Sequence, residues 1–331
     1  MNVSNGMKLN NISLKDKGIF NKFLSLKAHQ LSTYAFENIY IWKGLFDIKW
    51  LILQDTLCVF FQDKIGCFLY LAPLPGNKKP EVIKKAFQIM DRFNKNKDMS
   101  RIENIEEEDI SFYEDLGYAC QNKSYDYLCL RGDLAKLRGN KFKSKRACFN
   151  YFIKHYEFRY LPFSLKYRDG CLELYNSWVK ERKAKNLDRI YQGMLEDSRR
   201  SLKNALDNYS DLNFIGRMVR IDKKIKAFTF GFQLNQDTFC ILYEITDLSV
   251  KGLSQFIFSR LCSELENYKY INIMDDSGLE NLKKVKLSYH PAKLIPAYIA
   301  KRKNESRPPS KEYKKEYRKR WGMIRKEERG E

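Results

Sequence analysis

The stretch "NFIGRMVRIDKKIKAFTFGFQLNQDTFCILYEIT", residues 213–246, decides the fold class. Apolar and aromatic residues fill three runs, 213–221, 224–234 and 238–246, and short polar turns rich in Asp, Asn and Lys separate them. Runs of this length, bounded by turn residues, are typical of consecutive β-strands. We therefore expect three consecutive strands in the second half of the chain.

The same order of elements occurs twice along the chain. After these strands we expect a helix at 252–267, a strand at "KYINIM", a helix at 278–287 and a last strand around "KLIPAYIA". The order strand, strand, strand, helix, strand, helix, strand also describes residues 46–131, a span nearly as long as 213–300. A repeated pattern without obvious sequence identity predicts two similar α/β lobes.

Start and stop signals delimit the elements of the first copy. Pro80 opens a helix at 80–93, and Gly117 closes a second helix at 106–117. The other expected elements are a helix at 13–29, strands at 46–54, 57–62, 65–71 and 125–131, a short segment at 100–105, and helices between the two copies at 166–184 and 189–208.

Charge is unevenly distributed between the two halves of this basic protein, whose formal net charge is +20. Residues 1–130 contain 17 Lys and Arg against 16 Asp and Glu, whereas residues 131–331 contain 44 against 25. An excess of positive charge spread evenly along the chain would be typical of solubility alone, but an excess of positive charge in one half indicates an anionic partner. The partner classes are RNA, DNA, an anionic membrane surface and a polyphosphate. The oligomeric state does not follow from the sequence.

The cysteines and apolar runs indicate a soluble protein in a reducing compartment. The eight cysteines are at least nine residues apart, so no zinc-ligand spacing occurs. The N-terminus lacks the apolar core of a signal peptide. Asp55, Asp63 and Lys64 interrupt the most apolar region, which argues against a transmembrane helix. We therefore expect a cytoplasmic protein without a metal site.

A basic segment, "LRGNKFKSKRACFNYF" (137–152), lies between the two copies. At 100° per residue it predicts a helix whose apolar face docks onto a lobe. It is either a basic amphipathic connector or a phosphate-binding helix at the lobe junction. The apolar face comprises Phe142, Phe149, Phe152, Ile153 and Tyr156, and the basic residues beside it are Lys141, Lys143, Lys145 and Arg146.

The C-terminal region, 301–331, holds 13 basic and 6 acidic residues and includes a predicted helix, "KEYKKEYRKRW". It is either a solvated terminus or a phosphate-contacting appendage.

The element order of each copy resembles the GNAT acyltransferase fold. Three motifs, "YAFENIYIW" (34–42), the basic segment, and "INIMDDSGLENLKKVKLSYHPAKLIPAY" (271–298), resemble the C-terminal domain of the phosphatidylglycerol lysyltransferases, which are related to the Fem-type transferases. The resemblance implies a soluble member that lacks the membrane flippase half. It also implies tandem GNAT-like lobes, each with a mixed, mostly antiparallel sheet flanked by helices.

The expected boundaries follow from the repeat and the basic segment. The first lobe covers 1–136, a basic connecting helix 137–160, the second lobe 161–300 and a basic tail 301–331. We expect the second lobe to carry the site and the near-neutral first lobe to be scaffold. In the first lobe, "NIYIW" is expected to be an extended run.

The resemblance implies transfer of an aminoacyl group from aminoacyl-tRNA to an amine or hydroxyl acceptor, either a lipid or a small molecule or peptide. A GNAT enzyme that uses acyl-CoA usually holds the pyrophosphate on a glycine-rich turn. The matching stretch here, "ITDLSVKGLSQF", has only Gly252, with Lys251 before it. No cofactor is therefore expected beyond the tRNA co-substrate. Gly252 either simply starts a helix or, with Lys251, binds a tRNA phosphate.

Three residues are the candidate catalytic groups. Glu244 sits in a mostly apolar strand, where a carboxylate needs a partner. It is either a proton carrier or half of an ion pair with a lysine. Asp276 follows a strand and precedes Gly278, so it either caps the next helix or takes part in catalysis. His290 precedes Pro291, which favours an extended backbone that turns the ring into a cleft, although a structural role is the alternative.

Four further residues are candidate substrate contacts. Asp275 is available to bind an α-ammonium group, with capping as its alternative. Lys283 and Lys286 share a helix face that either binds phosphate or is simply solvated. Tyr289 either contacts substrate or packs in the core. The alternative functions are an acyl-CoA-dependent N-acyltransferase and a non-catalytic protein that binds RNA or an anionic surface.

Overall fold

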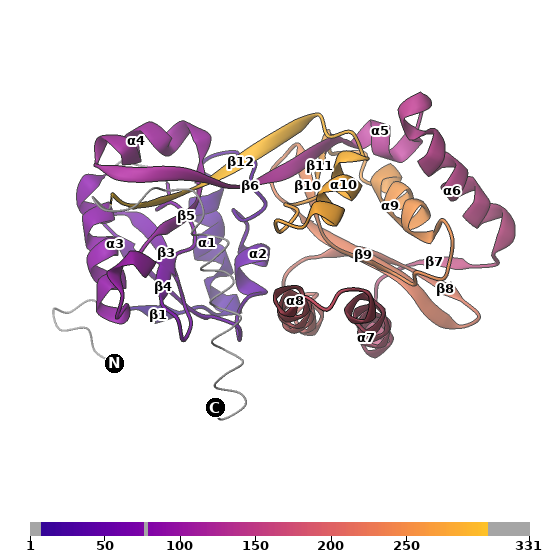
Figure 1. Ribbon diagram of the computed structural model, residues 1–331, viewed down its shortest axis with the longest axis horizontal. Coiled ribbons are helices and arrows are strands. Elements are labelled where there is room, and N and C mark those ends of the chain that lie inside the picture. The colour runs from indigo at the N-terminus through magenta and orange to yellow at the C-terminus, as the bar shows by residue number, and fades with distance from the viewer. Residues whose placement is uncertain (1–7, 76–78, 304–331) are drawn as a thin grey trace.

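The computed structural model describes residues 8–75 and 79–303, which form two lobes joined by one continuous sheet (Figure 1). The strand order is β1-β2-β3-β4-β5-β12-β6-β11-β10-β9-β8-β7. First-lobe strands are β1 (Asn10–Asn11), β2 (Asp47–Leu53), β3 (Thr56–Gln62), β4 (Cys67–Leu69) and β5 (Ile102–Glu106). Second-lobe strands are β7 (Arg159–Pro162), β8 (Ile215–Ile221), β9 (Lys224–Gln233), β10 (Thr238–Thr246) and β11 (Tyr270–Asn272).

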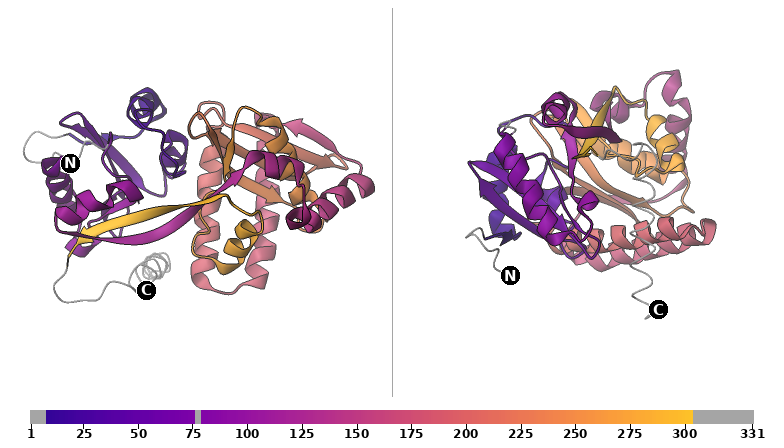
Figure 2. Two further views of the ribbon diagram at one scale, coloured as in Figure 1. Left: turned by 90° about the horizontal axis from the view of Figure 1, so that it is seen from above. Right: turned by 60° about the vertical axis from the view of Figure 1, so that its left-hand side comes forward.

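Two long strands, β6 (Tyr118–Leu130) and β12 (Lys293–Arg302), lie side by side and run between the lobes (Figure 2). β6 ends the first sequence copy, yet its last residues pair with β11 of the second lobe. β12 ends the second copy, yet it pairs with β5 of the first lobe. Each lobe therefore completes its sheet with a strand from the other copy.

The expected fold class is confirmed. Among the named strands, only β4–β5 and β10–β11 pair in parallel, and the other neighbours are antiparallel. The three strands predicted from the opening stretch are observed as β8, β9 and β10. In β9, the alternating residues Phe228, Phe230 and Phe232 lie on one face of the strand and are buried.

Helices cover both faces of the second-lobe sheet. α7 (Arg168–Lys185) and α8 (Arg189–Asp207) lie on one face, and α5 (Arg131–Lys136), α6 (Lys143–His155), α9 (Leu253–Glu264) and α10 (Glu280–Leu287) on the other (Figure 1). The first-lobe helices are α1 (Lys17–Leu24), α2 (Phe36–Tyr40), α3 (Pro80–Phe93) and α4 (Ile110–Asp115). Short 3-10 turns occur at Leu14–Asp16, Lys97–Met99, Glu107–Asp109, Asn140–Phe142 and Leu165–Tyr167.

The expectation of an extended run at "NIYIW" is wrong, because most of this motif is the short helix α2. Phe36 and Tyr40 are four residues apart, and their rings stack at 5.5 Å on one face of a helical turn. Asn38 is buried and donates a hydrogen bond to the Ser32 carbonyl oxygen at 3.0 Å. The helix thus supplies packing in the first lobe.

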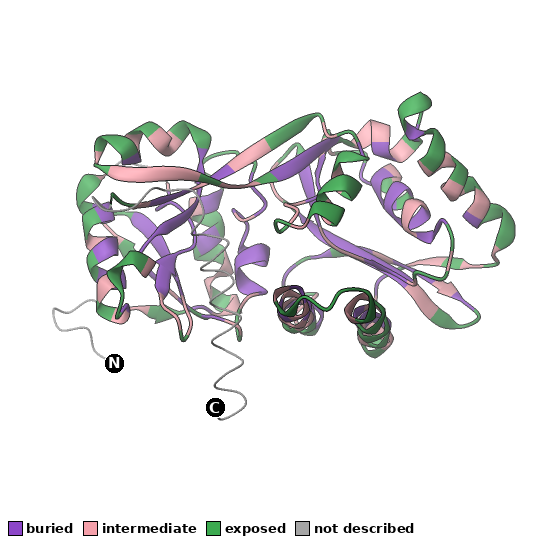
Figure 3. Ribbon diagram, viewed as in Figure 1, coloured by how far each residue is buried: buried purple, intermediate pink, exposed green. Residues whose placement is uncertain are grey.

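The basic segment is a helix, as expected, but it does not lie at the lobe junction. α6 packs on α9 and lies at the end of the second lobe that is farthest from the first lobe (Figure 1). Phe142 and Phe152 are fully buried, whereas Ile153, expected on the same face, is 47% exposed. α6 lies along the surface of the lobe, so its buried face is narrower than the predicted one (Figure 3).

Within the described residues, no helix has both the length and the apolar character needed to cross a bilayer. The helix predicted at "KEYKKEYRKRW" lies outside the described residues.

Candidate active site

A bulge in β10 decides which face of the sheet the Glu244 side chain occupies. Pairing between β10 and β9 skips one residue between Ile241 and Tyr243, so Leu242 is an extra residue in β10. An extra residue reverses the alternation of the side chains that follow it. Tyr243 consequently faces α8, and Glu244 faces α9, where Ser254 contacts it.

The Glu244 carboxyl group has a pKa that is raised towards neutrality. Ser254 Oγ donates a hydrogen bond to Glu244 Oε1 at 2.6 Å. Burial raises the pKa of Glu244 to about 7, even though this hydrogen bond and the charges of Lys286 and Lys145 oppose the rise. A carboxyl group with a pKa near neutrality can both accept and donate a proton. No ion pair in the described part of the chain includes Glu244, so the predicted direct pairing with a lysine is wrong.

Tyr289 and Lys145 lie next to Glu244. The Lys145 ammonium group is 3.6 Å from the centre of the Tyr289 ring and donates a hydrogen bond to Ser288 Oγ at 2.8 Å. Burial lowers the pKa of Lys145, and the Glu244 charge opposes this. Tyr289 is 7% exposed and packs on Phe258. Burial, followed by the nearby Glu244 charge, raises its pKa well above the ordinary value. Tyr289 is thus both a core residue and a neighbour of the site.

Lys286 connects Glu244 with a group of carboxylates near the lobe junction. Its ammonium group donates hydrogen bonds to the carbonyl oxygens of Ile273 and Met274 at the end of β11. Burial lowers the pKa of Lys286, whereas the charges of three aspartates raise it. These are Asp275, Asp126 and Asp276. Lys286 therefore interacts electrostatically with Glu244 and with this acidic group.

Asp126 is a buried member of that group that the sequence analysis missed. Its Oδ2 accepts hydrogen bonds from the Ser32 backbone N–H at 2.6 Å and from Asn272 Nδ2 at 2.9 Å. Burial, followed by repulsion from Asp275, raises the pKa of Asp126. The signal that marked Glu244, an acid within an apolar strand, was present here too in "YDYLCL".

Asp275 and Asp276 stabilise a tight loop rather than a helix end, so the predicted capping role is wrong. α10 starts at Glu280 and has no side-chain cap. Asp276 Oδ1 instead accepts a hydrogen bond from the Gly278 N–H at 2.8 Å, inside the loop, and its Oδ2 accepts one from the Tyr127 hydroxyl group. Met274 and Ser277 in the same loop have positive φ angles of 60° and 51°. Left-handed non-glycine residues store strain and often mark functional sites.

His290 does not join this group. It has a φ of 53°, so the expected extended backbone is wrong: a turn ends α10, and the His290 N–H bonds the Leu287 carbonyl oxygen at 2.9 Å. The ring is exposed, and Nε2 lies 3.1 Å from the Lys141 carbonyl oxygen. The Lys141 ammonium group pairs with Asp133 at 2.7 Å. Lys143 and Lys283 are exposed, and Lys283 does not share the half-buried position of Lys286.

Arg146 and Gly252 have structural roles. Arg146 Nη1 donates hydrogen bonds to the carbonyl oxygens of Leu137 and Gly139, just after α5, so the expected reach to the lobe junction is wrong. Gly252 has a φ of 83°, and a Cβ there would lie 2.0 Å from the Cys148 carbonyl oxygen of α6. The backbone of α6 therefore lies against the start of α9. Lys251 is exposed, with its ammonium group 4.4 Å from the Tyr151 ring centre.

The geometry thus brings some of the predicted residues together and separates others. Within the described residues, no group of three or more His, Cys, Asp or Glu side chains is arranged to hold a metal ion. The group that converges comprises Glu244, Ser254, Tyr289, Lys145, Lys286, Asp275, Asp276 and Asp126. The residues outside it are His290, Lys141, Lys143, Lys283, Arg146, Lys251 and Gly252.

Several solved structures are similar to this one. A conserved protein of unknown function from Bacteroides thetaiotaomicron has a TM-score of 0.80 and 27% identity, covering 90% of this chain and 100% of that chain. The C-terminal domain of a candidate lysylphosphatidylglycerol synthetase from Agrobacterium fabrum has a TM-score of 0.61, 13% identity and coverages of 88% and 92%. L-PGS from Bacillus licheniformis has a TM-score of 0.60, 18% identity and coverages of 88% and 93%.

At 13% and 18% identity, the structures from Agrobacterium fabrum and Bacillus licheniformis show only that the fold is shared. Among curated proteins, none matches the chain. A family model described as "Phosphatidylglycerol lysyltransferase, C-terminal" matches residues 25–301, which include both lobes and every residue of the converging group. The chain therefore belongs to the family of phosphatidylglycerol lysyltransferase C-terminal domains, a transferase family with a GNAT-like fold.

Proposed function

We propose that this protein transfers an aminoacyl group from aminoacyl-tRNA to an amine or hydroxyl acceptor. The observation that carries the proposal is the Glu244 carboxyl group, which has a pKa of about 7 and interacts electrostatically with Lys286 and Lys145. The family membership supports the same class of reaction. The tRNA ester is already activated, so positioning and charge stabilisation supply most of the acceleration.

The proposed reaction has two proton transfers. The acceptor amine or hydroxyl attacks the ester carbonyl carbon, and Glu244 takes the proton that the nucleophile loses. The bond between the carbonyl carbon and the ribose oxygen then breaks, and Glu244 returns the proton to that oxygen. The positive charges of Lys145 and Lys286 stabilise the negative charge that develops on the carbonyl oxygen.

Asp275 and Asp126 are proposed to hold the α-ammonium group of the aminoacyl moiety. Asp126 is 5% exposed and hydrogen-bonded to segments of both lobes, so it is rigidly placed. Repulsion from Asp275 contributes to its raised pKa, and a bound cation would relieve that repulsion.

The packing of α6 supports tRNA over acyl-CoA as donor. A pyrophosphate at the start of α9 would need open backbone N–H groups there. The Cys148 carbonyl oxygen approaches Gly252 so closely that even a methyl group would collide. The exposed lysines Lys143 and Lys251 are the proposed tRNA phosphate contacts on this side of the second lobe.

The test is incubation of the full chain with a set of labelled aminoacyl-tRNAs and cell extract, followed by identification of the labelled product. We expect transfer from at least one aminoacyl-tRNA and its loss in Glu244→Gln. Absence of transfer from every one of them would overturn the proposal and leave the non-catalytic alternative. Isothermal titration with acetyl-CoA tests the other alternative, an acyl-CoA-dependent N-acyltransferase, because micromolar binding of acetyl-CoA would favour that reaction.

A further inference from the structure

Thr229, in the middle of β9, carries a buried hydroxyl group that has no hydrogen-bond partner. The residue is fully buried, and its Oγ1 atom is unpaired within the described part of the chain. Ala227 and Gly231, two positions away on either side, share its face of the strand and have no polar side chain. Buried hydroxyl groups are nearly always paired, so this one requires an explanation from a neighbouring strand or helix.

The register of the sheet places Thr229 directly beside Glu244. The two residues are opposite each other in the antiparallel pairing of β9 with β10. Residues in this relation have side chains on the same face, with Cβ atoms about 4.5–5.5 Å apart. The bulge in β10 creates the relation, since the register before the bulge would place Tyr243 opposite Thr229. The extra residue therefore brings a carboxyl group and a hydroxyl group together.

The neighbour on the other side of Thr229 is already held by other groups. Arg217 of β8 lies opposite Thr229 in the pairing of β8 with β9. Its guanidinium group donates hydrogen bonds to Glu264 Oε2 at 2.6 Å and to the Gly216 carbonyl oxygen at 2.9 Å. Glu244 is therefore the better partner for the Thr229 hydroxyl group.

The Glu244 carboxyl group has a position open for a second partner. Within residues 8–75 and 79–303, the hydrogen bond from Ser254 to Oε1 is the only one that this carboxyl group makes. An ionised carboxylate accepts several hydrogen bonds, whereas a protonated carboxyl group also donates one. A hydroxyl group can donate to the first form and accept from the second. Thr229 thus carries a group that suits both protonation states of Glu244.

We propose that Thr229 is a positioning residue whose hydroxyl group pairs with the Glu244 carboxyl group during proton transfer. A change of the Thr229 side chain to another staggered conformation brings the hydroxyl group to Glu244 Oε2. The hydroxyl group donates while Glu244 is ionised and accepts while Glu244 is protonated. The role in proton transfer rests on the proposed function, but the contact itself can be tested without that reaction.

The contact differs in kind from the other influences on Glu244. The ionisable groups that interact with Glu244 through charge are Lys145 of α6, Lys286 of α10, Cys262 of α9 and Tyr289, which follows α10. Thr229 is uncharged and would act through a direct hydrogen bond. Hydrogen bonds to an ionised group are stronger than those to a neutral one. Thr229 should therefore hold the pKa of Glu244 down.

Carbon-13 NMR titration of the Glu244 carboxyl group in the full chain tests the contact. Thr229→Val removes the hydroxyl group and preserves the shape of the side chain. The pKa of Glu244 should therefore rise by about one unit. Thr229→Ser restores a hydroxyl group and should return the pKa to that of the unmodified protein. An unchanged pKa in Thr229→Val, or a pKa in Thr229→Ser that stays as high as in Thr229→Val, would overturn the proposal.

The pH dependence of aminoacyl transfer tests the role in proton transfer. The rate should rise as Glu244 ionises, and Thr229→Val should displace the midpoint upwards by about one unit. Below the midpoint the rate should fall about tenfold, and well above it the rate should be unchanged. A raised pKa of Glu244 with an unmoved midpoint would refute this role. A raised pKa with no transfer even in the unmodified protein would support the contact and overturn the proposed function, so the two failures are distinguishable.

Thr56→Val is the matched control. Thr56 is fully buried in β3 of the first lobe, and its hydroxyl group donates a hydrogen bond to the Gln54 carbonyl oxygen at 3.3 Å. Its replacement can lower the free energy of unfolding, but the pKa of Glu244 and the midpoint of transfer should not change. Equal shifts in Thr56→Val and Thr229→Val would show that general loosening of the structure, and not the Thr229 hydroxyl group, is responsible.

Discussion

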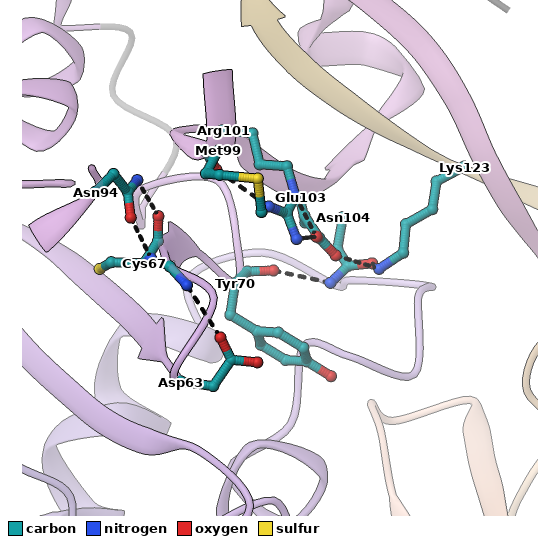
Figure 4. Close-up of polar contacts among 10 residues, drawn as sticks. Asp63, Cys67, Tyr70, Asn94, Met99, Arg101, Glu103, Asn104 and Lys123 are labelled. Carbon is teal, nitrogen blue, oxygen red and sulfur yellow. Dashed lines mark hydrogen bonds and ion pairs between the residues drawn. The ribbon is translucent and has the colours of Figure 1, made fainter. Parts of the chain in front are cut away.

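One glutamate in each lobe has a strongly shifted pKa, and the two shifts have opposite directions. Glu103 of β5 is 4% exposed and accepts hydrogen bonds from Arg101 Nε at 2.7 Å and Lys123 Nζ at 2.6 Å (Figure 4). Burial alone would raise its pKa, but the charges of Lys123 and Arg101 outweigh burial and lower the pKa to about 2. Glu103 is thus fully compensated and permanently ionised near neutral pH.

Glu244 of β10 is held by one serine hydroxyl group, and its lysines act from a distance. Its pKa of about 7 leaves it able to exchange a proton. Direct ion pairs fix a charge, whereas burial beside distant cations leaves it adjustable. The comparison teaches that two glutamates of one protein can differ in this way: direct ion pairs fix the charge of Glu103, whereas Glu244 can exchange a proton near neutral pH.

Glu103→Gln should give the largest effect, on stability. The substitution leaves Arg101 and Lys123 facing a neutral amide, and breaking a buried ion pair costs about 3–5 kcal/mol. Urea denaturation should show this loss in the free energy of unfolding. Glu81→Gln, at an exposed first-lobe position, is the control and should change little. An unchanged midpoint in Glu103→Gln would break the comparison.

Glu244→Gln should lower the rate of aminoacyl transfer and leave stability intact, the reverse of the effect expected for Glu103→Gln. The amide cannot carry a proton, so the rate of aminoacyl transfer should fall about 100-fold or more, while the free energy of unfolding near neutral pH should not fall. Rates with labelled aminoacyl-tRNA and urea denaturation measure the two effects. Glu266→Gln, exposed in the same lobe, should leave both unchanged. A stability loss in Glu244→Gln as large as that in Glu103→Gln would make Glu244 a structural residue.

The two glutamates should also give stability opposite dependences on pH. The folded pKa of Glu103 lies below its ordinary 4.5, so its contribution is lost as pH falls from 4.5 towards 2. The folded pKa of Glu244 lies above 4.5, so its contribution is present at low pH and lost as pH rises from 4.5 towards 7. Denaturation of both Gln variants and the unmodified protein across this range should show these slopes. Parallel slopes for the two variants would contradict the assignment.

The smallest effect is expected for Lys286→Met. Lys286 opposes the rise in the pKa of Glu244, so its removal should raise that pKa further, by about one unit or less. Carbon-13 NMR titration of the Glu244 carboxyl group, assigned with Glu244→Gln, measures the shift. Lys284→Met, exposed on the same helix, is the control. A downward shift in Lys286→Met would show that Lys286 does not act on Glu244 through its charge.

Much of the fold could be predicted from local pattern. The helix that Pro80 opens was expected at 80–93 and is observed as Pro80–Phe93. The three strands of the opening stretch also lie where turn residues bound them. The extended run predicted at "NIYIW" (38–42) is wrong because short aromatic runs fit a strand or a single helical turn equally well. The exchange of β6 and β12 was not predicted, since pairing partners distant in the sequence leave no periodic signal.

The candidate site was predictable only in part. An acid in an apolar strand singles out Glu244, and the same pattern occurs at Asp126 in "YDYLCL". The bulge at Leu242, which turns Glu244 towards α9, depends on pairing with β9 and could not be read from β10 alone. His290 is one of three histidines in the chain, but the rarity of a residue does not indicate where its side chain points, and the His290 ring lies outside the converging group.

The exchange of β6 and β12 has a consequence for how the chain matures during synthesis. The ribosome delivers β1 to β5 early, yet the strand that pairs beside β5 is β12, which ends at Arg302. Until then the first lobe exposes an unpaired sheet edge, which is a template for unwanted pairing. Loss of β12 would therefore damage the lobe made first, so a segment made late determines whether a segment made early reaches the native state.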